Sequence, residues 1–147
     1  MQPAGSKPDG LLCFWSNVFL EYAMKLDFSK LDGLLPAVVQ DATDGRVLMV
    51  GFMNEESFAR TVESGKVTFF SRSRNELWTK GGTSGHYLLV KDIQVDCDLD
   101  TVLIQAEELG PGVCHNGFRS CFYRRLCGGE WEPFEKPAFD PKAVYRK

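Results

Sequence analysis

The chain has 147 residues, of which 44% are hydrophobic and 25% are charged, and its formal net charge is −3. This size and balance predict one folded domain that needs neither a disulfide nor a metal merely to fold. The net charge gives no general attraction to nucleic acid or to an anionic membrane, so an anion site must be a local basic cluster. The five cysteines follow no regular framework, and we therefore expect reduced thiols and a cytoplasmic protein.

The start of the chain divides into two predicted segments. Residues 1–10 contain two prolines and two glycines and are expected to form a loose leader before a single domain over 11–147. Apolar residues at helical spacing predict a helix over 11–26 that packs on the body or on a partner chain. Polar residues interrupt this run, which argues against a membrane span, and no small-residue cleavage site follows, which argues against a signal peptide.

The rest of the chain reads as short strands separated by turns. Strand-like runs are predicted over residues 34–40, 46–52, 66–71, 76–80, 87–97 and 101–108. The pair Asp44–Gly45 predicts a hairpin between the first two runs, and Asn54 predicts the cap of a helix that ends at Gly65. Residues 81–85 are expected to form a glycine-rich loop. We therefore predict a mainly β, α+β fold: a small folded sheet or pseudobarrel of short strands with about two helices.

Three of the cysteines are candidate metal ligands. Cys97, Cys114 and Cys121 flank turn-rich segments, and Asn116–Gly117 allows the chain to fold back between the last two. Three thiolates suit zinc and leave a fourth position for water, which is the pattern of a catalytic site. The alternative is that the thiols are small buried core residues, because their spacing is not that of paired CxxC motifs. Cys127 is left out of the site, since an extended strand would place it about 20 Å from Cys121.

The segment "VDCDLD" (95–100) crowds the carboxylates of Asp96, Asp98 and Asp100 around a thiol. In a regular strand the carboxylates share one face, where oxygen ligands suit Mg²⁺, and the thiol lies on the other. A solvated acidic edge with a buried cysteine fits the alternation equally well. An EF-hand loop is a poor alternative, because Thr101 stands where that loop needs a glycine.

The segment "SRSRNELWTKGGTSG" (71–85) is the local basic cluster. Its cationic and hydroxyl side chains and its glycine N–H groups suit phosphate, and its tryptophan suits stacking on a base. The candidate substrate-binding residues are Ser71, Arg72, Ser73, Arg74, Trp78, Lys80, Thr83 and Ser84. A nucleic-acid patch has thin support from one short basic run in an acidic protein, and a solvated hairpin with a buried tryptophan remains an alternative.

His115 directly follows Cys114, within reach of anything bound at the thiols. An imidazole in that position can move protons to or from a reacting group, which makes His115 the candidate catalytic residue. The alternative is a hydrogen-bonded structural histidine.

Taken together, the motifs "MNEES", "SRSRNELWTKGGTSG", "VDCDLD" and "GPGVCHNGFRSCF" resemble those of the phosphoribosyl-AMP cyclohydrolases in order and spacing, from about residue 31 to 123. The resemblance implies the third step of histidine biosynthesis, in which a zinc-activated water opens the adenine ring of N1-(5-phosphoribosyl)-AMP at the N1–C6 bond. It implies zinc on the three cysteines, magnesium on the three aspartates, and a catalytic role for His115. It also implies an intertwined homodimer with its active sites at the subunit interface.

Two residues depart from the family's pattern. His86 stands where an asparagine is expected, which bears on the loop's contacts with substrate, and Asn116 stands where threonine is common. The expected partners are a small nucleotide and a second copy of the chain, with no nucleic acid and no membrane. Two other functions stay open: a zinc hydrolase of another purine nucleotide, such as a deaminase, and a structural zinc module that binds a partner. Against the deaminase, the sequence lacks the H-x-E…P-C-x-x-C signature.

Overall fold

The computed structural model describes residues 25–145. The predicted leader over 1–10 lies outside this range, and so does the predicted helix over 11–26 except for its last two residues. Of these two, Leu26 packs against the hydrophobic core. Between residues 25 and 145, no helix is long and apolar enough to cross a membrane.

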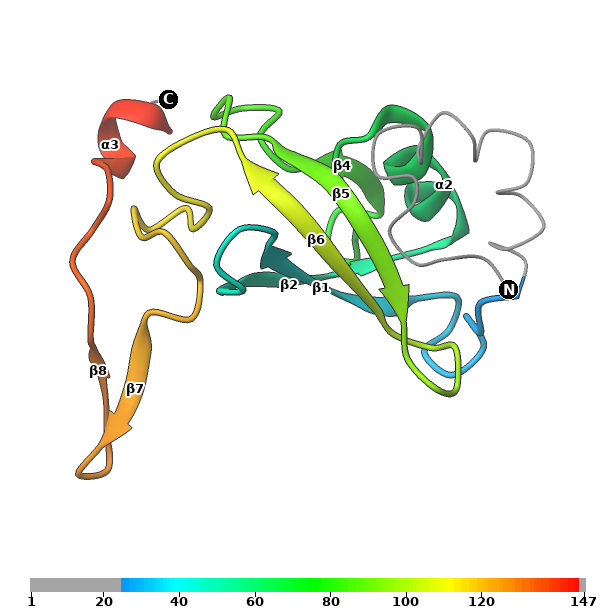
Figure 1. Cartoon of the computed structure of the whole chain (residues 1–147), viewed down its shortest axis with the longest axis horizontal. Coiled ribbons are helices and arrows are strands. Elements are labelled where there is room, and N and C mark those ends of the chain that lie inside the picture. The colour runs from blue at the N-terminus through cyan, green and yellow to red at the C-terminus, as the bar shows by residue number, and fades with distance from the viewer. Residues whose placement is uncertain (1–24, 146–147) are drawn as a thin grey trace.

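Most of the described chain forms short strands (Figure 1). The elements are β1 (Leu35–Asp41), β2 (Val47–Met53), α2 (Glu55–Ser64), β3 (Thr68–Ser71), β4 (Glu76–Thr79), β5 (Leu88–Val95), β6 (Val102–Glu108), β7 (Arg124–Cys127), β8 (Glu130–Pro133) and α3 (Pro141–Val144). A four-stranded sheet has the order β2-β1-β6-β5, in which β1 and β6 are parallel and the other pairs are antiparallel. The pairs β3–β4 and β7–β8 form separate two-stranded ribbons. The predicted mainly β, α+β class is confirmed.

Local sequence signals explain the first elements. The β1–β2 hairpin turns where it was predicted: Gly45 has a φ of 79°, and Asp41 accepts a backbone hydrogen bond from within the turn. The carbonyl side chain of Asn54 accepts the N–H of Ser57 at 2.8 Å and so caps the N-terminus of α2. Gly65 ends the helix in the left-handed conformation, as predicted.

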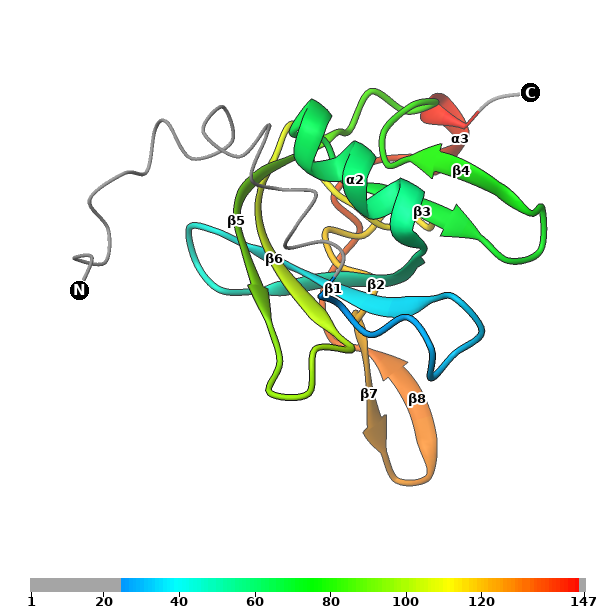
Figure 2. The same cartoon turned by 90° about the vertical axis from the view of Figure 1, so that its right-hand side faces the viewer.

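The core lies between one face of the sheet and the layer made by α2 with β3–β4 (Figure 2). Fully buried side chains include Leu35, Val39, Leu48, Met53, Val62, Phe69, Leu88 and Ile104. The ring of Phe69 packs so closely on β2 that a Cβ at Gly51 would lie 2.4 Å from it. The sheet therefore needs a glycine where the β3–β4 ribbon crosses it.

The acidic segment does not form a regular strand, and the prediction of two faces on one strand is wrong. Residues 96–101 form the turn between β5 and β6. Asp96 accepts the N–H groups of Asp100 (3.0 Å) and Thr101 (3.2 Å), and Leu99 has a φ of 65°. Because a side chain of the segment bonds its own backbone, the chain leaves the strand conformation here and the alternation rule does not apply.

The prediction of one strand through Cys121 and Cys127 is also wrong. Strand β7 begins at Arg124, three residues after Cys121, and Cys127 is exposed at its other end. The pair Gly128–Gly129, with φ values of 58° and 86°, then turns the chain into β8. This ribbon projects away from the body of the molecule (Figures 1 and 2), and all its residues are exposed.

Candidate active site

Residues 113–121 form a tight loop that brings two of the predicted zinc ligands together. Cys114 donates its N–H to the carbonyl of Phe118, and Gly117 donates its N–H to the carbonyl of Cys114, both at 3.0 Å. Gly117 adopts a φ of 95°, so the chain folds back at Asn116–Gly117 as predicted. The side chains of Cys114 and Cys121 come close enough across this loop for Cys114 to raise the pKa of Cys121.

The loop is anchored on strand β2. Cys121 donates its N–H to the carbonyl of Leu48 at 2.8 Å, and the hydroxyl of Ser120 donates to the carbonyl of Val47 at 2.7 Å. Because β2 belongs to the central sheet, the second cysteine of the loop has a rigid support.

The two thiols have different surroundings. Cys114 is buried, and its sulfur accepts the N–H of Asn116 at 3.4 Å. Cys121 is exposed as a residue, but burial of its sulfur, with a further contribution from Cys114, raises its pKa to about 12. A metal bound here must therefore displace the proton of Cys121. Two neighbouring sulfur ligands fit zinc, which prefers thiolates and imidazoles.

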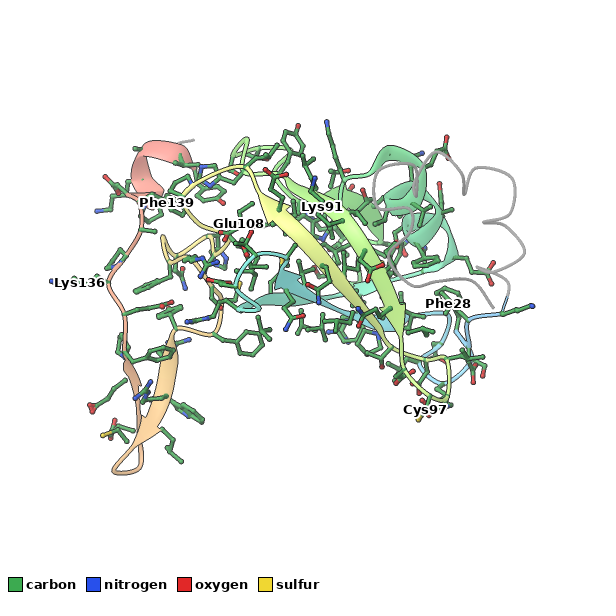
Figure 3. The ribbon with its side chains drawn as sticks, in the orientation of Figure 1. Phe28, Lys91, Cys97, Glu108, Lys136 and Phe139 are labelled. Atoms are coloured by element: carbon green, nitrogen blue, oxygen red, sulfur yellow. The ribbon has the colours of Figure 1, made fainter. Side chains whose placement is uncertain are left out.

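Cys97 does not join the other two thiols within one chain. It lies in the turn before β6, whereas Cys114 follows β6, and the seven residues of that strand span roughly 20 Å. Figure 3 shows Cys97 at the end of the sheet opposite Glu108. Over residues 25–145, three potential metal ligands come together only at Asp96, Asp98 and Asp100.

The three aspartates of the β5–β6 turn form a crowded acidic cluster, with carboxylate oxygens within 4.8 Å of one another. The ammonium of Lys30 lies 2.8 Å from Asp98 and 3.0 Å from Asp100. Lys30 lowers the pKa of Asp98, whereas the pKa of Asp100 is raised because its acidic neighbours and partial burial outweigh Lys30. Crowded oxygen ligands of this kind fit a divalent cation such as Mg²⁺.

A cavity of about 340 Å³ gathers most of the predicted substrate-binding residues with the predicted catalytic one. The predicted residues that line it are Arg74, Trp78, Lys80, Thr83, Ser84 and His115. Tyr145, next to α3, lines it too and was not identified from the sequence. Its signal was weak, because it lies far along the chain from every motif.

The remaining predicted substrate-binding residues lie elsewhere. Arg72 and Ser73 line a neighbouring cavity of about 510 Å³, and Trp78 lines both cavities. The guanidinium of Arg72 lies 4.1 Å from the centre of the Phe52 ring. Ser71 braces the local turn, since its hydroxyl accepts the N–H of Arg74 at 3.3 Å.

Lys80 is buried, with 7% of its surface exposed. Its N–H donates to the carbonyl of Val67 at 3.0 Å. Burial lowers the pKa of Lys80, while the nearby thiols of Cys121 and Cys114 act in the opposite direction. Lys80 is therefore buried in the cavity that His115 also lines rather than on the exposed part of the basic loop.

His86, one of the departures from the family's pattern, supports the cysteine loop. Its Nδ1 donates to the carbonyl of Gly112 at 3.0 Å, and its ring packs edge-on against Phe139 at 4.9 Å. A Cβ at Gly110 would lie 2.5 Å from the same ring. His86 thus contacts the chain just before Cys114 and the C-terminal segment.

Arg119, between the two cysteines of the loop, ties that loop to the sheet. Its guanidinium contacts Asp41 at 3.1 Å, Asp44 at 2.9 Å and Glu108 at 2.9 Å. Arg119 lowers the pKa of Asp44 to about 2. The pKa of Glu108 is raised because its burial outweighs Arg119. Asp41 and Asp44 lie at the β1–β2 turn, and Glu108 lies at the end of β6. The ion pairs of Arg119 therefore hold the cysteine loop against these two parts of the sheet, a connection that the sequence did not predict.

The scaffold is small and mainly β, and its cavity gathers a histidine and a lysine next to the loop that carries two cysteines. These are features of an enzyme, and comparison with known proteins supports the same conclusion. A profile of the phosphoribosyl-AMP cyclohydrolase family matches residues 49–123. The phosphoribosyl-AMP cyclohydrolase of Solibacter usitatus is 61% identical over 122 residues, which cover 83% of this chain and 97% of that protein. Those of Desulfatibacillum aliphaticivorans and Geotalea uraniireducens are 53% and 52% identical over 124 residues, which cover 84% of this chain and 99% of each relative.

The chain is therefore a hydrolase. It belongs to the phosphoribosyl-AMP cyclohydrolase family, whose enzymes act in histidine biosynthesis. The matched residues include the acidic turn, the cysteine loop and His115, and the resemblance seen in the sequence is confirmed. The two metals, the homodimer and the cytoplasmic location stay predictions.

Proposed function

We propose that this chain hydrolyses the N1–C6 bond of the adenine ring in N1-(5-phosphoribosyl)-AMP, with zinc and magnesium as cofactors. The observation that carries the proposal is the pair of neighbouring thiols, Cys114 and Cys121, which adjoins a cavity lined by His115 and the basic loop. The names of the relatives point to the same substrate. The chemistry that zinc supplies when bound is the activation of a water as a nucleophile near neutral pH.

The zinc ligands in this proposal come from two copies of the chain. Cys114 and Cys121 of one copy hold the metal together with Cys97 of the other. Because the single chain separates these groups by the length of β6, a second copy is needed to complete the set. A two-fold symmetric dimer forms two identical zinc sites, because each copy supplies Cys97 to one site and Cys114 and Cys121 to the other.

Exposed apolar side chains support this pairing. Large exposed apolar side chains lie near Cys97, near Cys121 and on or next to the β7–β8 ribbon: Val95, Leu99, Phe122, Leu126, Trp131 and Phe134. Trp131, at 67% exposure, is unusual for so large an apolar side chain. Apolar patches rimmed by polar residues mark protein interfaces, and a second copy covers these surfaces where it delivers Cys97.

The residues of the cavity have separate tasks in the reaction. Water adds to C6 of the adenine, the N1–C6 bond breaks, and N1 takes up a proton as it departs, while C6 becomes the carbon of a carboxamide. The imidazole of His115 holds the proton and passes it to N1. Arg74, Thr83 and Ser84 bind phosphate, and Trp78 stacks on the base. Asp96, Asp98 and Asp100 would hold Mg²⁺, which would neutralise phosphate charge in the completed dimer.

Turnover of N1-(5-phosphoribosyl)-AMP by the purified, metal-replete protein tests the proposal. We expect formation of the imidazole carboxamide product without release of ammonia, in a dimer that contains about one zinc per chain. Ammonia release would identify a deaminase instead. Tightly bound zinc without any turnover would identify a structural zinc module.

Replacing Lys30 with methionine is expected to tighten Mg²⁺ binding about threefold to fivefold, the scale of one exposed charge interaction. The reason is that the ammonium of Lys30 now contacts Asp98 and Asp100 and competes with a cation there. Isothermal titration of both proteins with Mg²⁺ measures the change. Lys91→Met removes an exposed lysine paired with Glu107 and serves as the control. Unchanged or weaker Mg²⁺ binding in Lys30→Met would contradict this expectation.

A further inference from the structure

The C-terminal segment, residues 134–145, packs directly on the cysteine loop. The carbonyl of Gly117 accepts the N–H groups of Ala138 at 2.6 Å and of Phe139 at 3.1 Å. The two parts of the chain approach so closely that a Cβ at Gly117 would lie 2.6 Å from the carbonyl oxygen of Phe139. The ring of Phe139, labelled in Figure 3, meets the ring of His86 edge-on, with the ring centres 4.9 Å apart. Backbone and side-chain contacts therefore hold this segment against the cysteine loop.

The last turn of the segment fixes the backbone of Tyr145. The side chain of Asp140 accepts the N–H of Lys142 at 3.0 Å and so caps the start of α3. Tyr145 donates its N–H to the carbonyl of Pro141 at 2.8 Å, which closes the turn. The centre of its ring lies 6.4 Å from that of Phe139. A short hydrogen-bonded turn thus connects the anchor on the cysteine loop to Tyr145.

Tyr145 gives the cavity of about 340 Å³ a second large aromatic ring. It is half-buried and lines this cavity together with His115 and Trp78. Trp78 belongs to β4, whereas His115 belongs to the loop on which the C-terminal segment packs. The tyrosine and the candidate catalytic histidine therefore reach the cavity from two segments that are hydrogen-bonded to each other.

The cavity offers different groups to different parts of a nucleotide. The side chains of Arg74, Thr83 and Ser84 are cationic or carry a hydroxyl, and they suit phosphate. A base and a ribose also present apolar surface, and its burial needs an apolar partner. Among the described residues that line the cavity, Tyr145 and Trp78 supply such surface with their rings.

We infer that Tyr145 is a substrate-binding residue whose ring packs on the nucleoside part of the purine nucleotide. The inference rests on the proposed function, and it gives the C-terminal segment a part in substrate affinity that no sequence motif indicated. Because the ring contacts the substrate in the ground state and in the transition state alike, its loss should raise KM and leave kcat nearly unchanged. Removal of an aromatic ring that stacks on a base typically weakens binding by about 5- to 150-fold.

The test measures binding of AMP and turnover of N1-(5-phosphoribosyl)-AMP by the full chain, replete with zinc and magnesium. Tyr145→Ala is expected to weaken AMP binding about tenfold in isothermal titration and to raise KM by a similar factor. Tyr145→Phe, which keeps the ring, is expected to lose no more than about threefold. Val144→Ala, in the same turn but outside the lining of the cavity, is the control and should bind AMP normally. Circular dichroism monitors folding, and Tyr145→Leu replaces Tyr145→Ala if the latter does not fold.

Two results would overturn the inference. If Tyr145→Ala binds AMP and substrate like the wild type, then Tyr145 lines the cavity without touching the ligand. If Tyr145→Ala lowers only kcat, then the tyrosine acts through the cysteine loop and not on the substrate. Weaker AMP binding by Tyr145→Ala, in a protein whose wild type shows no turnover, would support the inference while defeating the proposed function. A wild type that neither binds AMP nor turns over the substrate would defeat both.

Discussion

Subunits of two inactive variants, Cys97→Ser and Cys114→Ser, are expected to recover about a quarter of wild-type activity when they are mixed. In the proposed dimer each zinc is held by Cys97 of one copy and by Cys114 and Cys121 of the other. A mixed dimer thus has one site that lacks two ligands and one that is complete. With random pairing, half of the dimers are mixed, and half of the sites in a mixed dimer are intact.

The measurement is zinc content and turnover of each variant alone and after joint refolding or co-expression. Cys114→Ser alone is expected to lose both zinc and turnover, because it removes the buried sulfur of the pair. Cys127→Ser is the matched control: this thiol is exposed at the end of β7, and its loss should leave zinc and activity unchanged. Mixtures that stay inactive would contradict the shared site, and loss of zinc in Cys127→Ser would favour a closed structural centre.

Sequence signals correctly predicted those elements whose conformation is determined by residues close to them in the chain. The Asp44–Gly45 turn, the Asn54 cap and the Gly65 terminus each act within a few residues, and each was found where it was expected. Similar signals were present but not used for the last elements. Gly128–Gly129 is a hairpin signal for β7–β8, and Asp140 followed by Pro141 is a typical start of α3.

The candidate site was predictable in its residue types but not in its geometry. Alternation failed at "VDCDLD" because Asp96 bonds the backbone of its own turn, yet the same turn gathers the three carboxylates. The predicted strand over 101–108 already lies between Cys97 and Cys114, but whether the chain after it returns Cys114 to Cys97 is tertiary information. The burial of Lys80 in the cavity that His115 also lines likewise depends on segments far apart in sequence, and no local pattern signals it.

Replacing Arg119 with methionine is expected to reduce the free energy of unfolding by about 3 kcal/mol at pH 7, the lower end of the range for a broken buried ion pair, because the cluster is only partly buried. The side chain of Arg119 is 33% exposed, whereas those of Asp41 and Glu108 are 10% and 12% exposed. Removing the guanidinium leaves these two carboxylates without their cation. Denaturant unfolding, at matched zinc and protein concentrations, measures the loss, and Arg60→Met on the exposed side of α2 is the control.

The loss in Arg119→Met should depend on pH in a definite direction. In the wild type the pKa of Glu108 is already raised by burial, and Arg119 opposes that rise. Without Arg119 the pKa rises further, so Glu108 takes up a proton more readily as the pH falls and the repulsion from Asp41 is relieved. Asp44, whose pKa Arg119 holds at about 2, stabilises the wild type above its ordinary pKa of 3.8 and loses this effect only as the pH falls towards 2. The variant should therefore lie closer to the wild type in stability at pH 5 than at pH 7, and an equal loss at both pH values would show that protonation of Glu108 does not contribute to the difference.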